Sequence, residues 1–203
     1  WHWAQLGDYK IWESRQERLL GVTIDRNLDF ESHISKICLN ANRKLSALAR
    51  VSRMMSLLKR KILFNAFVKS QFANCPLVWM FHDRQINAKI NRLHERALRI
   101  VYQDDISTFE ELLTRDEGFT IHERNIQLVA IEVYKSKIGL SPDFMNEVFP
   151  KKEHGRINMR NNSEYIVPRT NTVHNGDDSL RHLGPLIWNI VPDYIKSKRS
   201  LNA

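Results

Sequence analysis

Near the start of the chain, apolar residues alternate with small or polar residues. Leu20, Val22 and Ile24 occupy every second position, which is typical of a half-buried β-strand. The Asp-Arg-Asn run that follows at residues 25–27 favours a turn. We therefore expect a short β segment and its junction at residues 1–28.

After this junction the apolar residues recur every three or four positions, the spacing of a helix that buries one face. A first helix is expected from its N-cap at Asp29 to a point before Met54. Ser56 is expected to cap a second helix and Asp83 a third. The apolar face predicted for the second helix consists of Leu58, Ile62, Leu63, Ala66 and Phe67.

Helix signals continue in the middle of the chain. Ser107 with Glu110, and Thr120 with Glu123, have the Ser/Thr-x-x-Glu spacing of a capping box. The helix that begins at the second box is expected to end at Gly139. We therefore expect one helical domain at residues 29–150.

The last part of the chain is more mixed. Residues 151–164 are polar and aperiodic and predict a linker. Residues 165–168 and 170–174 favour short strands, and the apolar closing stretch around Trp188 is expected to pack back onto the body. The predicted fold class is mainly α: a helical bundle with a short N-terminal β segment and a small irregular or β extension at residues 151–203.

Positive charge is concentrated in the three expected helices. Residues 36–99 contain 14 lysines and arginines but only two acidic residues, a local net charge of +12, whereas the whole chain carries +8. The other 139 residues therefore carry −4. Such a surface repels itself unless a polyanion neutralises it, and phosphate backbones are the commonest polyanion. The predicted phosphate contacts are Arg43, Lys44, Arg50, Arg53, Lys59, Arg60, Lys61, Arg92, Arg96 and Arg99.

Composition narrows the remaining classes of protein. The chain has 203 residues and is 42% hydrophobic, enough for a buried core. No apolar run approaches the roughly 18–20 residues that span a bilayer, so no membrane partner is expected. Cys38 and Cys75 are the only cysteines, which favours an intracellular setting, nuclear or cytoplasmic. Few aromatic residues interleave with the cations, so backbone contact is favoured over base stacking.

Two acidic motifs suggest metal-dependent chemistry but have a simpler interpretation. Residues 102–105 spell Tyr-x-Asp-Asp, the pattern with which reverse transcriptases hold catalytic Mg²⁺. Here the pattern lies between two expected helices rather than at a β-hairpin tip, so we interpret it as an interhelical turn. Asp177 and Asp178 are likewise interpreted as a turn. Cys38, Cys75 and His82 lack the spacing of zinc ligands, and no metal site is predicted.

Several short motifs resemble the region just past the palm in non-LTR (LINE-type) retrotransposon reverse transcriptases, in particular the jockey-like elements of invertebrates. They occur in the order of that family from about residue 9 to about residue 201. The motifs are Leu20–Asp25 with Leu28, Phe30, His33 and Ile34; Ser70–Phe72 leading to Cys75–Trp79; Arg92–Arg99; and Leu183–Pro185 with Ile187–Asn189 and Pro192.

The resemblance implies a helical thumb that holds an RNA–DNA or DNA template–primer duplex, followed by a C-terminal extension. It also implies that the fingers, most of the palm and any endonuclease precede Trp1 in the same polypeptide. The catalytic carboxylates and their Mg²⁺ would then belong to that palm, with no cofactor in this part. The expected function is therefore duplex binding within an RNA-directed DNA polymerase of a transposable element. The chain alone is expected to be inactive as a polymerase.

Two alternatives remain open at the level of sequence. In the first alternative, the chain is a stand-alone basic helical module that binds nucleic acid. In the second, it is a structural or decayed remnant of a transposable element, without activity. The coding sequence upstream of Trp1 distinguishes the polymerase interpretation from the stand-alone module. A second Tyr-x-Asp-Asp there supports the polymerase, and a nearby start codon supports the module.

Overall fold

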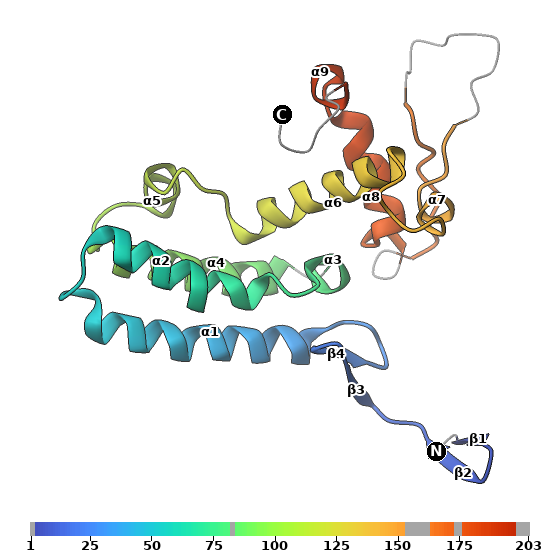
Figure 1. The fold of residues 1–203 in the computed structure, drawn as a ribbon, viewed down its shortest axis with the longest axis horizontal. Helices are drawn as coiled ribbons and strands as arrows, with labels where there is room; N and C mark the ends of the chain where they lie inside the picture. The colour runs from blue at the N-terminus through green and yellow to red at the C-terminus, as the bar shows by residue number, and fades with distance from the viewer. Residues whose placement is uncertain (1–2, 82–83, 153–162, 173–175, 198–203) are drawn as a thin grey trace. The chain divides into compact units, whose positions relative to one another are not determined.

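The computed structural model describes residues 3–81, 84–152, 163–172 and 176–197, and the fold is mainly helical, as the sequence predicts (Figure 1). The chain divides into two compact units, Trp1–Gly118 and Phe119–Ala203. The sequence-based boundaries at residues 28 and 150 do not coincide with this division. The β segment belongs to the same unit as the first helices, and the helix after Thr120 belongs with the C-terminal part.

Two antiparallel hairpins form the start of the first unit. Strands β1 (Trp3–Leu6) and β2 (Tyr9–Trp12) pair with each other, as do β3 (Gln16–Leu19) and β4 (Val22–Asp25). Leu20 and Gly21 connect β3 to β4 with φ angles of 49° and 90°. Positive φ at both central residues is typical of a tight hairpin turn. The alternation around Leu20 therefore belongs to a turn and one strand, not to a single continuous strand.

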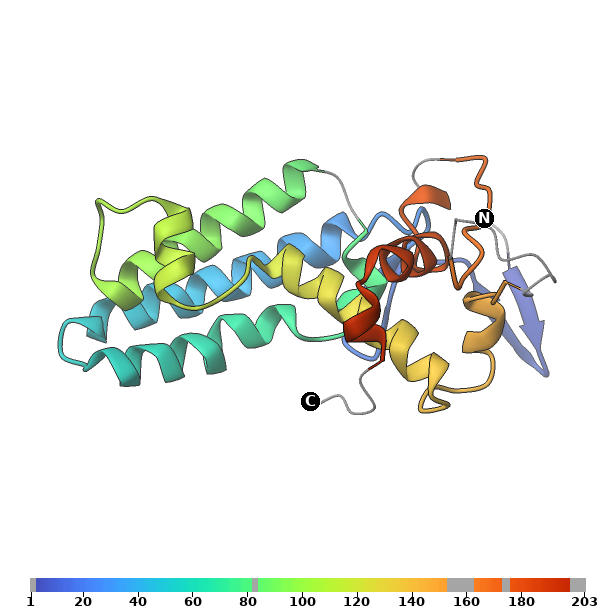
Figure 2. The ribbon, with the colours of Figure 1, turned by 90° about the horizontal axis from the view of Figure 1, so that it is seen from above.

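Three long helices form the body of the first unit: α1 (Glu31–Ser52), α2 (Leu57–Phe67) and α4 (Arg84–Tyr102). They contact one another pairwise, with α1 lying between α2 and α4 in the view of Figure 2. The short elements η1 (Lys69–Phe72) and α3 (Pro76–Trp79) connect α2 to α4, and α5 (Phe109–Arg115) packs on α4. Fully buried apolar residues fill the bundle, among them Ala41, Leu45, Phe64, Trp79 and Leu98.

The junction from β4 into α1 is organised by one carboxylate. The side chain of Asp25 accepts hydrogen bonds from the backbone N–H groups of Asn27, Asp29 and Phe30, at 2.8 to 3.2 Å. Burial raises the pKa of Asp25, but these donors outweigh it and the pKa is lowered. Phe30, in a left-handed conformation, is the N-cap residue, so the prediction of Asp29 was wrong by one position.

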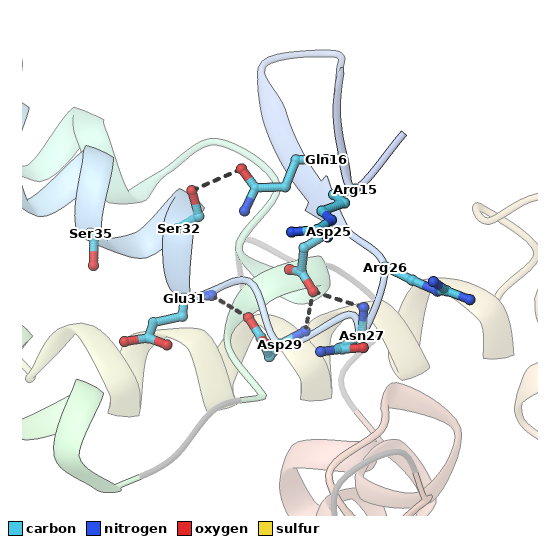
Figure 3. A pocket seen from close by; sticks show the side chains of 9 residues that line it. All are labelled: Arg15, Gln16, Asp25, Arg26, Asn27, Asp29, Glu31, Ser32 and Ser35. Atoms are coloured by element: carbon cyan, nitrogen blue, oxygen red, sulfur yellow. Dashed lines mark hydrogen bonds between the residues drawn. The ribbon is translucent and has the colours of Figure 1, made fainter. Parts of the chain in front are cut away.

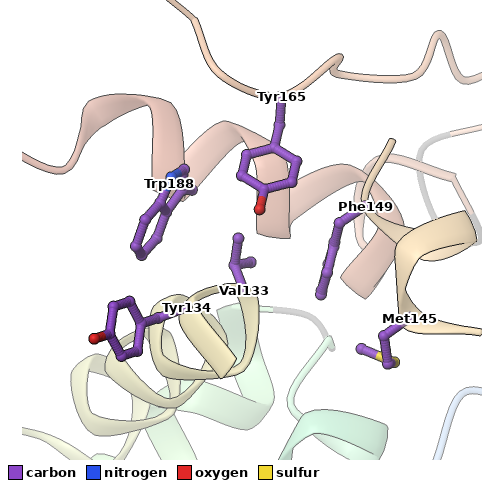
Figure 4. Packing of buried hydrophobic residues seen from close by; sticks show 6 residues of the cluster. All are labelled: Val133, Tyr134, Met145, Phe149, Tyr165 and Trp188. Atoms are coloured by element: carbon purple, nitrogen blue, oxygen red, sulfur yellow. The ribbon is translucent and has the colours of Figure 1, made fainter. Parts of the chain in front are cut away.

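The second unit is built on α6 (Ile121–Lys137) and α8 (Leu180–Ile190), which pack together. Helices α7 (Met145–Val148) and α9 (Asp193–Lys196) are short. Figure 4 shows the buried side chains that fill the space between the elements of this unit. Trp188 is buried among them and its indole N–H donates to Glu164 at 2.9 Å, so the closing stretch packs within the second unit. The cluster consists of Val133, Tyr134, Met145, Phe149, Tyr165 and Trp188.

Local signals in the sequence were confirmed in part. Thr120 and Glu123 form the predicted capping box, whereas the other box joins Thr108 to Glu111 instead of Ser107 to Glu110. After α6, Gly139 has a φ of 74°, and the Leu140 N–H donates to the Lys135 carbonyl at 2.8 Å, as in a Schellman motif.

The expected strands of the C-terminal extension are not formed in the part of it that the structure describes. Tyr165 makes one isolated bridge with Lys151, and the rest of residues 163–172 is irregular. The second expected strand lies partly outside the described residues. Asp83, the expected cap of the third helix, and most of the linker at residues 151–164 also lie outside them. The extension is instead organised by α8, whose N-cap Ser179 accepts from the His182 N–H.

Candidate nucleic-acid interface

Most of the predicted phosphate contacts are exposed on the bundle of the first unit. Lys61 and Arg99 are half-buried and Arg60 is buried. The exposed ones are Arg43, Lys44, Arg50 and Arg53 around α1, Lys59 on α2, and Arg92 and Arg96 on α4.

Arg60 is the clearest exception, because its side chain points into the bundle and only 8% of it is exposed. Its Nε donates to the Val101 carbonyl at 2.6 Å, and Nη1 donates to the Ser52 and Met55 carbonyls at 3.2 and 2.9 Å. These carbonyls lie near the C-terminal ends of α1 and α4, where backbone acceptors lack helical partners and a positive charge is favourable. Arg60 therefore ties the ends of two helices together and is not available to a phosphate.

The orientation of α2 explains this error. Arg60 and Phe64 face the core, while Leu58 and Ile62 are 69% and 56% exposed. The predicted apolar face of α2 is therefore mostly on the outside. Apolar residues occur on several sides of this helix, so its period alone did not fix which side would be buried.

Lys61 is also engaged within the protein. Its Nζ lies 3.4 Å from the Asp116 carboxylate and 5.2 Å from the centre of the Tyr102 ring. Contact with Tyr102, and then with Asp116, raises the pKa of Lys61. Lys69 pairs with the same carboxylate at 3.3 Å. The basic run at residues 59–61 therefore offers only Lys59 to solvent without an ion pair among the described residues.

On α4 the predicted cations differ in their partners. Arg99 pairs with Glu95 at 2.7 Å, and Arg96 donates to the uncharged side chain of Asn42 at 2.6 Å. Arg92 is exposed and has no ion pair within the described residues. The charges of Arg92 and Arg96 are therefore not compensated by a neighbouring acid.

Two exposed lysines of the same surface were missed by the sequence-based assignment. Lys36 lies on α1, and Lys89 on α4 donates to the Ser35 hydroxyl at 3.3 Å. Neither has an acidic partner in the part of the chain that the structure describes. Helical spacing could have found both, because Lys36 is seven residues before Arg43 and Lys89 is seven before Arg96.

The Tyr-x-Asp-Asp run forms the turn between α4 and α5, as predicted. Gln103 is left-handed, and the Asp104 carboxylate accepts from the N–H groups of Ile106 and Ser107, at 3.0 and 2.9 Å. The same carboxylate pairs with Arg115 at 2.9 Å. Hydrogen bonds from Ser107 hold the pKa of Asp104 far below its usual range. Asp104 thus serves the turn, and Asp177 likewise accepts from the Thr170 hydroxyl ahead of α8.

Two histidines are buried in the bundle. The Nδ1 of His33 accepts from the Thr23 backbone N–H at 3.3 Å, which links α1 to β4. His94 stacks on Phe64 and meets the edge of Phe109, with ring centres 5.8 and 5.6 Å apart. Burial lowers the pKa of both rings, that of His94 to about 4. These histidines are neutral core residues at physiological pH.

An open depression of about 800 Å³ lies where the β3–β4 hairpin meets the start of α1 (Figure 3). Its lining includes the cations Arg15 and Arg26 but also Asp25, Asp29 and Glu31. The acids outnumber the cations, and the Asp25 carboxylate is already occupied by backbone donors. This depression therefore does not suit a phosphate group.

Within the described residues there is no group of three or more His, Cys, Asp or Glu side chains placed to hold a metal ion. No helix of the same residues is both long and apolar enough to cross a membrane. The fold and the surface together define a mainly helical, two-unit protein with a basic helical bundle. No family model, no curated protein and no solved structure matches the chain.

Proposed function

We propose that this chain is the thumb-containing C-terminal part of a non-LTR retrotransposon reverse transcriptase. In this role the basic bundle holds the template–primer duplex through backbone phosphates. The observation that carries the proposal is the set of exposed cations on α1 and α4 without acidic partners among the described residues. An RNA–DNA or DNA duplex supplies the missing negative charge, and phosphate contact needs no base readout.

The motif residues support this proposal because they occupy defined places in the fold. Gly21, in the Leu-Gly-Val-Thr-Ile-Asp run, has the positive φ of the β3–β4 turn, and Asp25 organises the start of α1. His33 and Trp79 come from two different motifs and meet edge to face, with ring centres 6.2 Å apart. In the proposed polymerase, the palm upstream of this chain supplies the carboxylates and Mg²⁺, in the nucleus or cytoplasm.

A salt titration of duplex binding tests the proposal. We expect log K to fall linearly with log salt, with a slope near −3 to −4 if about four phosphates are neutralised. Polyglutamate of matched charge is the control competitor, and it should displace the duplex only weakly. A chain that ignores duplex at low salt would contradict the proposal and favour a structural or decayed remnant.

A stand-alone nucleic-acid-binding module is the second candidate. The buried core of the first unit favours it, because a bundle with its own core can hold its basic surface without a palm. Both candidates bind duplex, so binding does not separate them. The upstream reading frame does, as a second Tyr-x-Asp-Asp before Trp1 is expected only for the polymerase.

A further inference from the structure

The cations of α1 and α4 share one spacing. Seven residues make almost two helical turns, so residues seven apart stay on one side of a helix and drift by only about 20°. The heptad-spaced sets are Lys36, Arg43 and Arg50 on α1, and Lys89 with Arg96 and Arg92 with Arg99 on α4.

Two hydrogen bonds fix the register between these helices. Lys89 Nζ donates to Ser35 Oγ at 3.3 Å, and Arg96 Nη1 donates to Asn42 Oδ1 at 2.6 Å. Each bond joins residues 54 apart in sequence, and the second lies seven residues further along both helices. Helices α1 and α4 therefore run parallel and side by side, which Figure 2 also shows.

A strip of uncharged side chains, which includes the half-exposed Leu39, separates the two sets of cations. At 100° per residue, the sides of α1 that carry Ser35, Asn42 and Ser46 lie between α4 and the side that carries Arg43. Across the described part of α1 and α4 the acidic residues are Glu31, in the first turn of α1, and Glu95, which pairs with Arg99. The strip is thus positive on both borders over about 21 Å from Lys36 to Arg50, at 1.5 Å per residue.

We propose that this strip, named here the α1–α4 track, binds the sugar–phosphate backbone of one strand of a nucleic-acid duplex. The inference rests on the proposed function and adds its path on the surface, with Lys36 and Lys89 as new contacts. A backbone lying in the track meets guanidinium and ammonium groups from both sides, and the Ser35 hydroxyl and the Asn42 amide from below. The α2 surface, with Leu58 and Ile62 exposed, lies outside the track.

The lack of aromatic groups selects a duplex over a single strand. Single-strand surfaces stack bases on exposed aromatic side chains. Along α1 and α4 the only aromatic side chains are His33 and His94, both buried, and the half-buried Tyr102 at the C-terminal end. A strand held here by phosphates alone keeps its bases turned away from the protein, as they are in a duplex.

Charge-matched variants of the full 203-residue chain test the track in salt titrations of a DNA duplex, an RNA–DNA hybrid and a single strand. Each variant loses three positive charges. Both track variants should flatten the slope of log K against log salt by up to about 2.7 units, at 0.9 per phosphate, and the control should not. The variants are Lys36→Gln/Arg43→Gln/Arg50→Gln on α1, Lys89→Gln/Arg92→Gln/Arg96→Gln on α4, and the control Arg124→Gln/Lys152→Gln/Arg181→Gln at exposed positions of the second unit.

The outcomes separate the two proposals. If the wild-type chain binds no duplex, the proposed function fails and the track fails with it. If the wild type binds but both track variants behave like the control, the track alone is wrong. If the wild type binds the single strand more tightly than the duplex, and the track variants flatten the salt slope for that strand, the assignment to a duplex is wrong. If a triple variant loses its helical circular dichroism, the single variants Arg43→Gln and Arg92→Gln replace it. The expected change in the salt slope is then about one third as large.

Discussion

Arg60 lies in a run of three basic residues, yet its guanidinium is inside the bundle because three backbone carbonyls converge there. We expect Arg60→Met to reduce the free energy of unfolding by roughly 2–4 kcal/mol, since it removes hydrogen bonds from a charged donor and leaves buried acceptors unpaired. Lys59→Met, at an exposed neighbour, should change it by about 0.5 kcal/mol or less. Urea denaturation measures both.

The Arg60→Met variant also distinguishes a structural role of Arg60 from contact with phosphate. Below its unfolding midpoint, Arg60→Met should keep the salt slope of duplex binding. An Arg60→Met chain as stable as the wild type, but with weakened and flattened duplex binding, would return Arg60 to the interface.

His94 should make the stability of the first unit sensitive to acid. Its folded pKa of about 4 lies below the ordinary value of 6.5. The unfolded chain therefore takes up the proton first, so the contribution is complete above pH 6.5 and is lost as the pH falls towards 4. A shift of about 2.5 units corresponds to roughly 3 kcal/mol.

A leucine at this position tests the acid effect of His94. His94→Leu fills the site between Phe64 and Phe109 without ring nitrogens, which have no hydrogen-bond partner among the described residues. The variant should lose much of the pH dependence of unfolding between about pH 4 and 6.5. The buried His33, whose pKa is also lowered by burial, should account for a remaining slope. A wild-type pH dependence in the variant would show that His94 does not titrate in this range.

At the scale of elements, Gly184 decides how closely α8 approaches the turn after α7. A Cβ at this position would meet the Phe149 ring, 3.0 Å from Cδ1 and closer still to Cε1. Although alanine favours helices, Gly184→Ala should destabilise the second unit by about 1–3 kcal/mol because the core is overpacked. Arg181→Ala, exposed on the same helix, is the control in thermal unfolding. A more stable Gly184→Ala chain would mean that Phe149 moves aside freely.

The α4–α5 turn gives a prediction for a complete polymerase that contains this region. Asp104→Asn with Asp105→Asn should slow polymerisation by less than about tenfold, because the Asp104 carboxylate serves the turn and the Asp105 side chain is exposed. Losing a true catalytic carboxylate would cost several kcal/mol of barrier, at about 1.4 kcal/mol per tenfold. Steady-state primer extension, with circular dichroism as the check of folding, makes the measurement. A folded double variant thousands-fold slower would overturn the turn interpretation.

For the whole molecule, we expect no primer extension by this chain alone with Mg²⁺ or Mn²⁺, even under conditions in which the proposed duplex binding is measured. The reason is that Asp104 is held by Ser107 and Arg115, and that the proposed polymerase has its catalytic carboxylates in the palm. A gel assay on RNA and DNA templates checks this. Extension that disappears in Asp104→Asn would make the local motif catalytic.

The sequence by itself determined the features that depend on neighbouring residues. The apolar period fixed the existence of α1 and its end before Met54, and Thr120 with Glu123 fixed the start of α6. Charge counting located the uncompensated cations in one part of the chain. These signals are local, because helix periodicity and capping act over three or four residues.

Only the tertiary structure decided which side of each helix became core and which cations stayed free. Helix α2 carries apolar residues on several sides, and it turns Arg60 inwards because the carbonyls of Ser52 and Val101 need donors. Asp116 neutralises Lys61 although 55 residues separate them. The register between α1 and α4 brings Lys89 beside Ser35 and Arg96 beside Asn42, although 54 residues separate each pair in the sequence. No local pattern encodes such pairings, since they depend on how the helices pack.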